Sequence, residues 1–260
     1  MAYLTDEQQQ QFINDGYVVV RNLLPADVVT KTRESIFETT GLRDDDPSTW
    51  GSVVLPEAAP LTQACRTREV EEVARELVGD NFLPGMSYSP VLELRGEDPV
   101  KRGYIPVMAY PKAGPREFVA PDGFHIDGMH LVTTWPSKNF LVVFAYLCDV
   151  AEYGGATTIR PGSHRQVFEH WLRTGDKGNT HPPDLDYAAP IPMPGRAGDV
   201  IFMHYLAVHS GSNNYSDHIR VGLNTAVMPD PDNPYQPKTG APQPDWTPLD
   251  WTLRTDNLTL

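Results

Sequence analysis

The hydrophobic pattern divides the chain into two parts, with helical periodicity before residue 80 and short apolar runs after it. In the first part, apolar side chains recur at intervals of three and four, the spacing of a helix with one buried face. Thr5 and Gln8 have the spacing of a capping box, and Gly16 suits the left-handed residue that ends a helix. The pattern predicts helices at 5–15, 25–40 and 70–78, and a strand at 17–20.

The second part consists of short apolar runs separated by Gly and Pro, which is typical of strands. Helices first and many short strands later indicate a helical layer packed on a mainly β core, either a double sheet or a barrel. One further helix is expected at 164–173. The predicted strands are 86–94, 104–110, 118–126, 139–148, 155–160, 199–205, 207–212 and 218–228.

Seven prolines in residues 229–260 exclude a regular helix or strand there, so we expect an ordered wrap or the edge of a lid. A chain of 260 residues is long enough to bury one large core. We therefore predict a single domain, with N-terminal helices in 1–80, a β core at about 86–228 and the proline-rich tail.

The net charge of −13 argues against nucleic acid as a partner and, more weakly, against anionic membranes. No stretch approaches the roughly 18 uncharged apolar residues of a membrane span, and the N-terminus lacks the basic and apolar regions of a secretory signal. Cys65 and Cys148 are too few for a disulfide scaffold. These features predict a cytoplasmic protein.

His125 and Asp127 lie two residues apart, so an extended strand would place both side chains on one face. With a distant third ligand they would form the 2-His-1-carboxylate arrangement that suits iron(II) and leaves positions for O2 and organic ligands. The tripeptide alone carries little weight, because 8 His and 21 Asp in 260 residues produce about 0.65 such pairs by chance.

His209 is the candidate third ligand, because the small residues 210–212 after it leave room for an incoming molecule. His204 is its rival, and a continuous strand would place the two on opposite faces. Eleven residues after His209, Arg220 opens an apolar strand. A buried arginine is costly unless a carboxylate meets it, so a clamp on a dicarboxylic acid is favoured over a surface arginine.

These motifs resemble the phytanoyl-CoA dioxygenase family of iron(II)/2-oxoglutarate oxygenases over most of the chain. The most specific of them is residues 154–164, Gly-Gly-Ala-Thr-Thr-Ile-Arg-Pro-Gly-Ser-His, which is similar to the family's Gly-Ala-x-x-x-x-Pro-Gly-Ser-His segment. Residues 4–20 are similar to its first helix and strand. The segment 197–199, His209 and Arg220 then follow in the family's order and spacing.

The resemblance implies a double-stranded β-helix, the jelly-roll or cupin-like core, with catalytic iron(II) on His125, Asp127 and His209. It also implies that 2-oxoglutarate and O2 are consumed, with Arg220 on the far carboxylate of 2-oxoglutarate. Thr157 matches a position that touches this cosubstrate. Phe144 falls where the family often has an aromatic residue near it, with core packing as the alternative, and His164 is expected to be structural.

Two departures from the family pattern bear on the chemistry. Many relatives carry Ser two residues after the distal histidine, where this chain has Gly211, so Ser210 or Ser212 is expected to replace that contact unless it is missing. Family halogenases replace the metal carboxylate with a small residue. The retained Asp127 therefore favours hydroxylation or a related oxidation.

The expected substrate is a small organic molecule, an amphipathic secondary metabolite, rather than a protein or nucleic acid. Loops on a rigid scaffold carry specificity, so 41–63, 95–103, 174–195 and the tail are expected to frame the entrance. Two alternatives stay open: a metal-dependent jelly-roll enzyme that does not use 2-oxoglutarate, and a non-catalytic module that binds a small molecule. The aromatic residues of these regions line a pocket or simply pack: Trp50, Tyr104, Trp135 and Tyr187.

Overall fold

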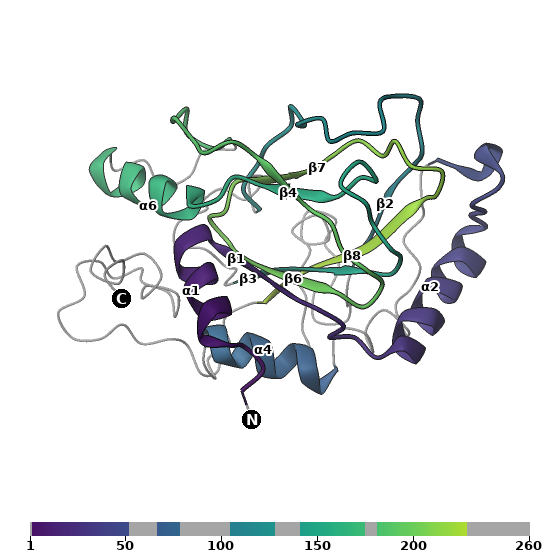
Figure 1. Ribbon diagram of the computed structural model, residues 1–260, viewed down its shortest axis with the longest axis horizontal. Coiled ribbons are helices and arrows are strands. Elements are labelled where there is room, and N and C mark those ends of the chain that lie inside the picture. Colours follow the sequence, from purple (N-terminus) through teal and green to yellow (C-terminus); the bar gives the residue numbers. More distant parts are fainter. Residues whose placement is uncertain (1, 52–66, 79–104, 128–140, 175–180, 228–260) are drawn as a thin grey trace, which may run out of the picture.

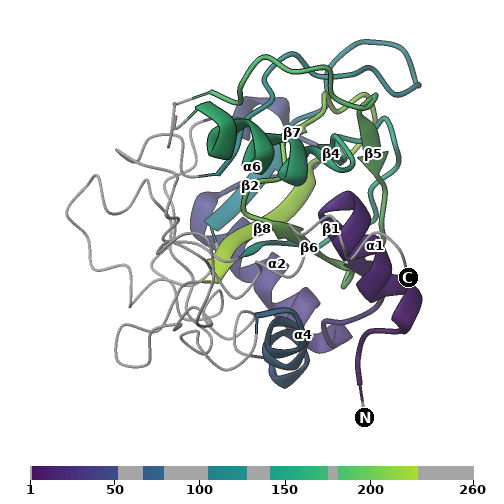
Figure 2. The same cartoon turned by 90° about the vertical axis from the view of Figure 1, so that its left-hand side faces the viewer.

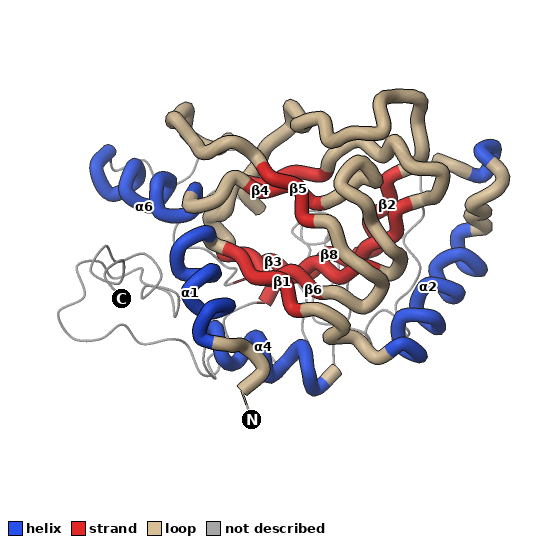
Figure 3. The backbone as a smooth tube through the Cα atoms, viewed as in Figure 1, coloured by secondary structure: helices blue, strands red, loops and turns tan. Residues whose placement is uncertain are grey.

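The computed structural model describes residues 2–51, 67–78, 105–127, 141–174 and 181–227. Four α-helices and eight strands lie in these ranges (Figure 1, Figure 3). The helices are α1 (Asp6–Asp15), α2 (Ala26–Thr40), α4 (Arg68–Val78) and α6 (Ser163–Thr174), with a 3-10 turn η1 (Pro47–Thr49). The strands are β1 (Tyr17–Val20), β2 (Ile105–Ala109), β3 (Leu141–Tyr146), β4 (Thr157–Ile159), β5 (Ile191–Met193), β6 (Val200–His204), β7 (His209–Gly211) and β8 (Arg220–Val227).

The strands form two antiparallel sheets that face each other. The larger has the order β1-β6-β3-β8-β2, and the smaller has the order β5-β4-β7 (Figure 1). Neighbours in each sheet come from distant parts of the chain, as in the pairing of β1 with β6 through Val18 and Phe202. Two facing sheets with such crossovers are the predicted jelly-roll arrangement, and the mainly β fold class is confirmed.

Two apolar layers hold the sheets in place. Strand alternation sends Val142 and Phe144 to the inner side of the larger sheet, where they pack with Ile159 of the smaller one. Val143 and its outward-facing neighbours join the other layer, to which α2 and α4 contribute Ile36 and Val73. Figure 2 shows these two helices on the side of the larger sheet that faces away from β4 and β7. The helices therefore support one sheet and leave its inner side free to build a site.

The predicted helices and most predicted strands are confirmed within a few residues. Thr5 and Gln8 form both bonds of the expected capping box, and Gly16 ends α1 with φ of 80°. Residues 118–126 contradict the prediction, because they form a loop whose single β-bridge joins His125 to His209. Strand β5 was not predicted, since three residues with a central proline give no recognisable pattern.

Several predictions fall outside the described residues. These are the strand at 86–94, the loop at 95–103, the proline-rich tail, Cys65, Tyr104 and Trp135. Cys148 is a half-buried free thiol, and burial raises its pKa. In the part of the chain that the structure describes, no helix is long and apolar enough to cross a membrane.

Candidate active site

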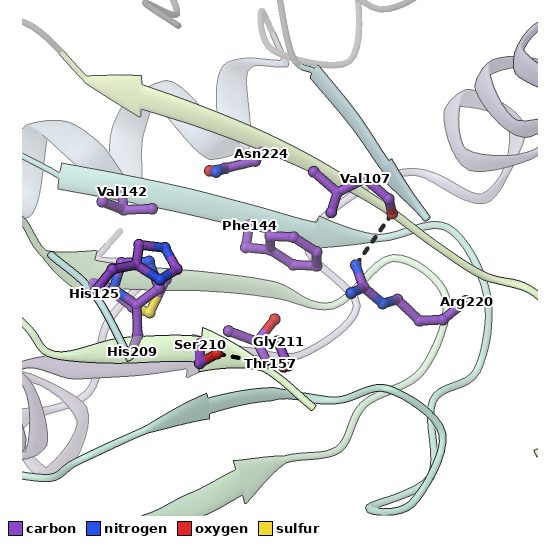
Figure 4. Close-up of a pocket in the computed structure, with 11 residues that line it drawn as sticks. Val107, His125, Val142, Phe144, Thr157, His209, Ser210, Gly211, Arg220 and Asn224 are labelled. Carbon is purple, nitrogen blue, oxygen red and sulfur yellow. Dashed lines mark hydrogen bonds between the residues drawn. The ribbon is translucent and has the colours of Figure 1, made fainter. Parts of the chain in front are cut away.

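His125 and His209 face each other across an antiparallel bridge between the loop before residue 127 and strand β7. Each backbone N–H donates to the carbonyl of the other residue at 2.9 Å. Directly opposed residues of antiparallel strands send their side chains to the same face. The two imidazole rings accordingly lie with centroids 4.5 Å apart at one end of an inner cavity (Figure 4).

Asp127 completes a cluster of three candidate metal ligands. Its Oδ1 lies 3.6 Å from Nε2 of His125 and 3.6 Å from Nε2 of His209. One ligand atom from each residue falls within 4.8 Å of the others. Among the described residues, this is the group of side chains of metal-ligating type that lies close enough together to hold a metal ion. Two neutral nitrogens and a carboxylate that converge from three positions match the donor set of a mononuclear iron(II) site.

Backbone carbonyls fix which nitrogen of each ring faces the cluster. Nδ1 of His209 lies 2.9 Å from the carbonyl of Ala207, and Nδ1 of His125 lies 3.3 Å from that of Gly123. When Nδ1–H donates to these carbonyls, the Nε2 lone pairs are directed at the space beside Asp127. Such second contacts orient metal-ligating histidines, so the cluster is prepared for a cation.

The pKa values of the two histidines are shifted in opposite directions. Burial, with a smaller effect of His209, lowers the pKa of His125 despite the nearby carboxylate. Burial also disfavours the charged form of His209, yet its pKa is raised because the interactions with Asp127 outweigh that cost. The cluster thus favours one positive charge between the nitrogens and the carboxylate, which a metal ion would supply in place of a proton.

The cavity runs between the two sheets from the histidines to Arg220, with a volume of about 110 Å³ (Figure 4). A water needs only about 10–15 Å³ of such a cavity, so the space suits a small molecule. Apolar side chains form part of its wall, among them Val142, Phe144 and Met203. A ligand that binds the metal end is therefore held in an apolar channel that leads to a guanidinium group.

Arg220 is 5% exposed and its charge is only partly met by the protein. One Nη1–H donates to the carbonyl of Val107 at 3.1 Å, and the Phe144 ring lies 5.2 Å from Cζ. Nε is buried without a hydrogen-bond partner, and among the described residues no carboxylate pairs with Arg220. Burial lowers the pKa of Arg220, which reflects the cost of an unneutralised cation.

This arrangement fits the cosubstrate predicted from the sequence. A carboxylate supplied by a ligand would satisfy the free donors of Arg220, whereas the surface position that was the alternative reading is excluded by burial. The distance from the histidine end to the arginine end is spanned by one continuous cavity. A dicarboxylic acid with one end on the metal and the other on Arg220 would occupy it.

The structure brings only some of the other residues predicted to contact 2-oxoglutarate to the cavity. Thr157 and Phe144 line the cavity, and the backbone N–H of Thr157 donates to the hydroxyl of Tyr146. Ser212 does not line it, because its hydroxyl donates to the carbonyl of Ala156 at 3.0 Å. Ser210 does lie at the cavity wall, but its hydroxyl donates to the Gly123 carbonyl at 3.0 Å.

Gly211 faces Arg220 across the cavity, and a Cβ placed there would lie 3.6 Å from Nη2 of the arginine. The position that carries Ser in many relatives is thus open space next to the guanidinium. Neither neighbouring serine has a free hydroxyl with which to replace that contact. Of the two readings from the sequence, the missing contact is favoured.

His204, the rival ligand, lies outside the cavity. It is fully buried, its Nδ1 accepts the N–H of Leu206 at 3.0 Å, and its ring lies 5.0 Å from that of His164. The turn after β6 separates it from His209, so the two residues belong to different sheets. Burial lowers the pKa of His164 to about 3, as suits the structural role expected for it.

Asn224 is a cavity residue that the sequence analysis missed. It lies four positions after Arg220 on β8, and strand alternation sends both side chains to the inner face. Its Oδ1 is buried without a hydrogen-bond partner. The even spacing from Arg220 was the signal that would have identified it.

Comparison with known proteins supports the fold described above. Solved structures with the same fold include the epimerase SnoN in complex with Fe3+, alpha-ketoglutarate and nogalamycin RO, with 20% identity, 92% of each chain covered and a TM-score of 0.57. The carbocyclase SnoK from nogalamycin biosynthesis has 23% identity over 87% of this chain and 84% of its own, with a TM-score of 0.59. EctD from S. alaskensis, with 2-oxoglutarate and 5-hydroxyectoine, has 18% identity over 98% and 84%, with a TM-score of 0.57.

No curated protein sequence matches the chain. Residues 12–222, however, match the family described as phytanoyl-CoA dioxygenase (PhyH), a span that holds all three candidate metal ligands and Arg220. The chain therefore belongs to the phytanoyl-CoA dioxygenase family, which confirms the enzyme class predicted from its sequence motifs.

Proposed function

We propose that this protein is an iron(II)- and 2-oxoglutarate-dependent dioxygenase that oxidises a small organic molecule, with an amphipathic secondary metabolite as substrate. The observation that carries the proposal is the single cavity with three convergent ligands at one end and a buried, unneutralised arginine at the other. Relatives of the same fold act in nogalamycin biosynthesis or are solved with 5-hydroxyectoine, which supports a small-molecule substrate.

In this proposal His125, Asp127 and His209 hold the iron, and the ion supplies activation of O2 when it is bound. Arg220 binds the far carboxylate of 2-oxoglutarate, and Thr157 and Phe144 lie along the path between the two ends. The apolar walls exclude water from the reacting groups. No side chain of the cavity is required as a nucleophile or as a general base.

Asp127 also bears on the outcome of the reaction. A carboxylate at this place leaves no vacancy for a halide among the protein ligands. Hydroxylation or a related oxidation is therefore proposed rather than halogenation. We further propose that the chain forms one catalytic domain that acts in the reducing cytoplasm without a nucleic-acid or membrane partner, in keeping with its net charge of −13 and its free thiol.

The test is a titration of the full chain with iron(II) and 2-oxoglutarate under anaerobic conditions, followed by succinate release in air over a library of secondary metabolites. We expect a weak visible absorption band that needs both additions, and succinate release that selected metabolites increase. Asp127→Ala is expected to abolish the band, whereas Asp122→Ala, an exposed carboxylate close by in sequence, is expected to keep it. Absence of the band in the unaltered protein would favour the non-catalytic alternative.

The variant Arg220→Ala distinguishes a 2-oxoglutarate-dependent enzyme from a metal-dependent enzyme that does not use 2-oxoglutarate. Turnover that does not change when this arginine is removed would take 2-oxoglutarate out of the mechanism. It would then favour a metal-dependent oxidation or isomerisation within the same fold. We expect instead that the visible band and succinate release are both lost at 2-oxoglutarate concentrations that saturate the unaltered protein.

A further inference from the structure

Apart from Arg220, the larger sheet lines the cavity with apolar side chains and the amide of Asn224. The Asn224 side chain is half-buried, Oδ1 has no hydrogen-bond partner, and Val107, Val142 and Phe144 surround it at the cavity wall. A buried acceptor left unpaired by the protein is costly, and a donor from a bound ligand or an ordered water would remove that cost. The strand itself does not require an amide here, because a branched apolar residue would suit the wall better.

Asn224 lies away from the end of the cavity at which Arg220 would bind the far carboxylate of 2-oxoglutarate. Arg220 pairs with Ala109 on β2, whereas Asn224 pairs with Ile105, so four residues or about 13 Å of strand lie between them. Arg220 faces Gly211 on the opposite sheet. In Figure 4 the amide of Asn224 points away from Arg220, toward the end of the cavity where His125 lies. The far carboxylate of a cosubstrate held by Arg220 would therefore lie away from this amide.

We propose that Asn224 binds the primary substrate through a hydroxyl group, and that the substrate is an apolar small molecule bearing an alcohol or phenol next to the carbon that is oxidised. This inference rests on the proposed function. The unpaired oxygen requires a hydrogen-bond donor from the ligand, which a ketone, an ether or a hydrocarbon does not provide. A hydroxyl group both donates and accepts, so it satisfies the amide in either orientation of its oxygen and nitrogen.

The adjacent residue on β8 offers a matched control. Thr225 is 8% exposed, its hydroxyl is also buried without a partner, and alternation sends it to the opposite face of the sheet. Thr225→Val and Asn224→Leu each remove a buried, unpaired polar group from the same strand and keep the shape of the side chain. Only the second change touches the cavity.

The probes are two compound series, 1-tetralol with 1-tetralone and tetralin, and cyclohexanol with cyclohexanone and cyclohexane. Each is added to the full chain loaded anaerobically with iron(II) and 2-oxoglutarate, and binding is measured by the thermal unfolding midpoint and by the visible band. We expect the unaltered protein and Thr225→Val to bind an alcohol roughly 10-fold or more tightly than its ketone or hydrocarbon. Asn224→Leu is expected to lose this preference, and Asn224→Gln to keep part of it.

An unaltered protein that binds the members of both series equally, or not at all, would overturn the inference, as would an alcohol preference that survives in Asn224→Leu. A Kd for 2-oxoglutarate that rises about 10-fold in Asn224→Leu would also overturn it, because the amide would then contact the cosubstrate. The proposed function is judged separately by the visible band before any probe is added. Absence of the band would reject the function, whereas absence of an alcohol preference in an unaltered protein that shows the band rejects only the role of Asn224.

Discussion

Replacement of Arg220 by methionine should change stability and cosubstrate affinity in opposite directions. In the free protein this guanidinium is 5% exposed, donates one hydrogen bond to Val107 and has no carboxylate partner among the described residues. A charge buried in this way costs several kcal/mol before any ligand arrives. The arginine is thus kept at the expense of stability, and the cost is recovered when a ligand carboxylate binds.

Arg220→Met loses a hydrogen bond of about 1 kcal/mol and an aromatic contact of similar size with Phe144, and it removes a desolvation cost of several kcal/mol. We expect the free variant to be about 1–3 kcal/mol more stable than the unaltered protein. Loss of a buried, charge-assisted contact costs about 2–5 kcal/mol, so the Kd for 2-oxoglutarate should rise roughly 30- to several-thousand-fold.

The assay measures thermal unfolding of the full chain, first alone and then with iron(II) and increasing 2-oxoglutarate under anaerobic conditions. Plotted against 2-oxoglutarate concentration, the unfolding midpoints of the two proteins should cross. Arg220→Met has the higher midpoint without ligand, and of these two proteins only the unaltered one gains stability as 2-oxoglutarate is added. Arg116→Met is the control, since its exposed ion pair with Asp217 should contribute less than about 1 kcal/mol. A less stable free variant, or one with unchanged affinity, would refute this account of Arg220.

Three further predictions concern single side chains. In Gly222→Ala the new Cβ would lie 2.3 Å from Cζ of Phe144, so the ring must move within the cavity. We expect the free energy of unfolding to fall by about 1–3 kcal/mol and the Kd for 2-oxoglutarate to rise at least roughly 10-fold. Gly51→Ala, whose Cβ would meet no atom within 4 Å, is the control. Burial holds the pKa of His164 at about 3 against 6.5 in the unfolded chain. The contribution of the neutral imidazole to the free energy of unfolding is therefore fully present above about pH 6.5. It is lost as the pH falls toward 3, by about 1.4 kcal/mol per pH unit. The free energy of unfolding of His164→Asn, measured in urea, should decline less steeply between pH 6.5 and 4 than that of the unaltered protein. Equal slopes would contradict this. Ser212→Ala should cost about 1 kcal/mol in thermal unfolding yet leave 2-oxoglutarate affinity within about twofold, and a large loss of affinity would place Ser212 at the cosubstrate after all.

The sequence predicted the ligand cluster for a reason that depends little on strand pairing. Two residues at positions i and i+2 of any extended segment share a face, so His125 and Asp127 converge although 118–126 is not a strand. One bridge to His209 is enough to bring the third ligand to the same place. Local spacing and one long-range contact therefore determine the cluster.

The contacts along the cavity could not be predicted in this way, because they depend on sheet register. Thr157 pairs with Gly211, which turns Gly211 toward Arg220 and leaves Ser212 bonded to Ala156. A shift of one residue would exchange the faces of every side chain on β7, and three residues contain no periodic signal that excludes such a shift. The choice among Ser210, Gly211 and Ser212 thus required the fold.

Gly211 leads to the last prediction, in which an added side chain improves the site. A Cβ at this position would meet nothing closer than Nη2 of Arg220 at 3.6 Å, so serine fits without displacing the backbone. Its hydroxyl would lie beside the guanidinium, where the far carboxylate of 2-oxoglutarate is proposed to bind. A hydrogen bond to a charged group contributes about 1.5–3 kcal/mol, so Gly211→Ser should lower the Kd for 2-oxoglutarate roughly 10- to 150-fold. Gly211→Ala adds the same Cβ without the hydroxyl and should leave the Kd within about twofold. If both variants bind 2-oxoglutarate more weakly, the space at Gly211 is needed by the ligand itself, and the carboxylate lies closer to β7 than the position of Arg220 implies.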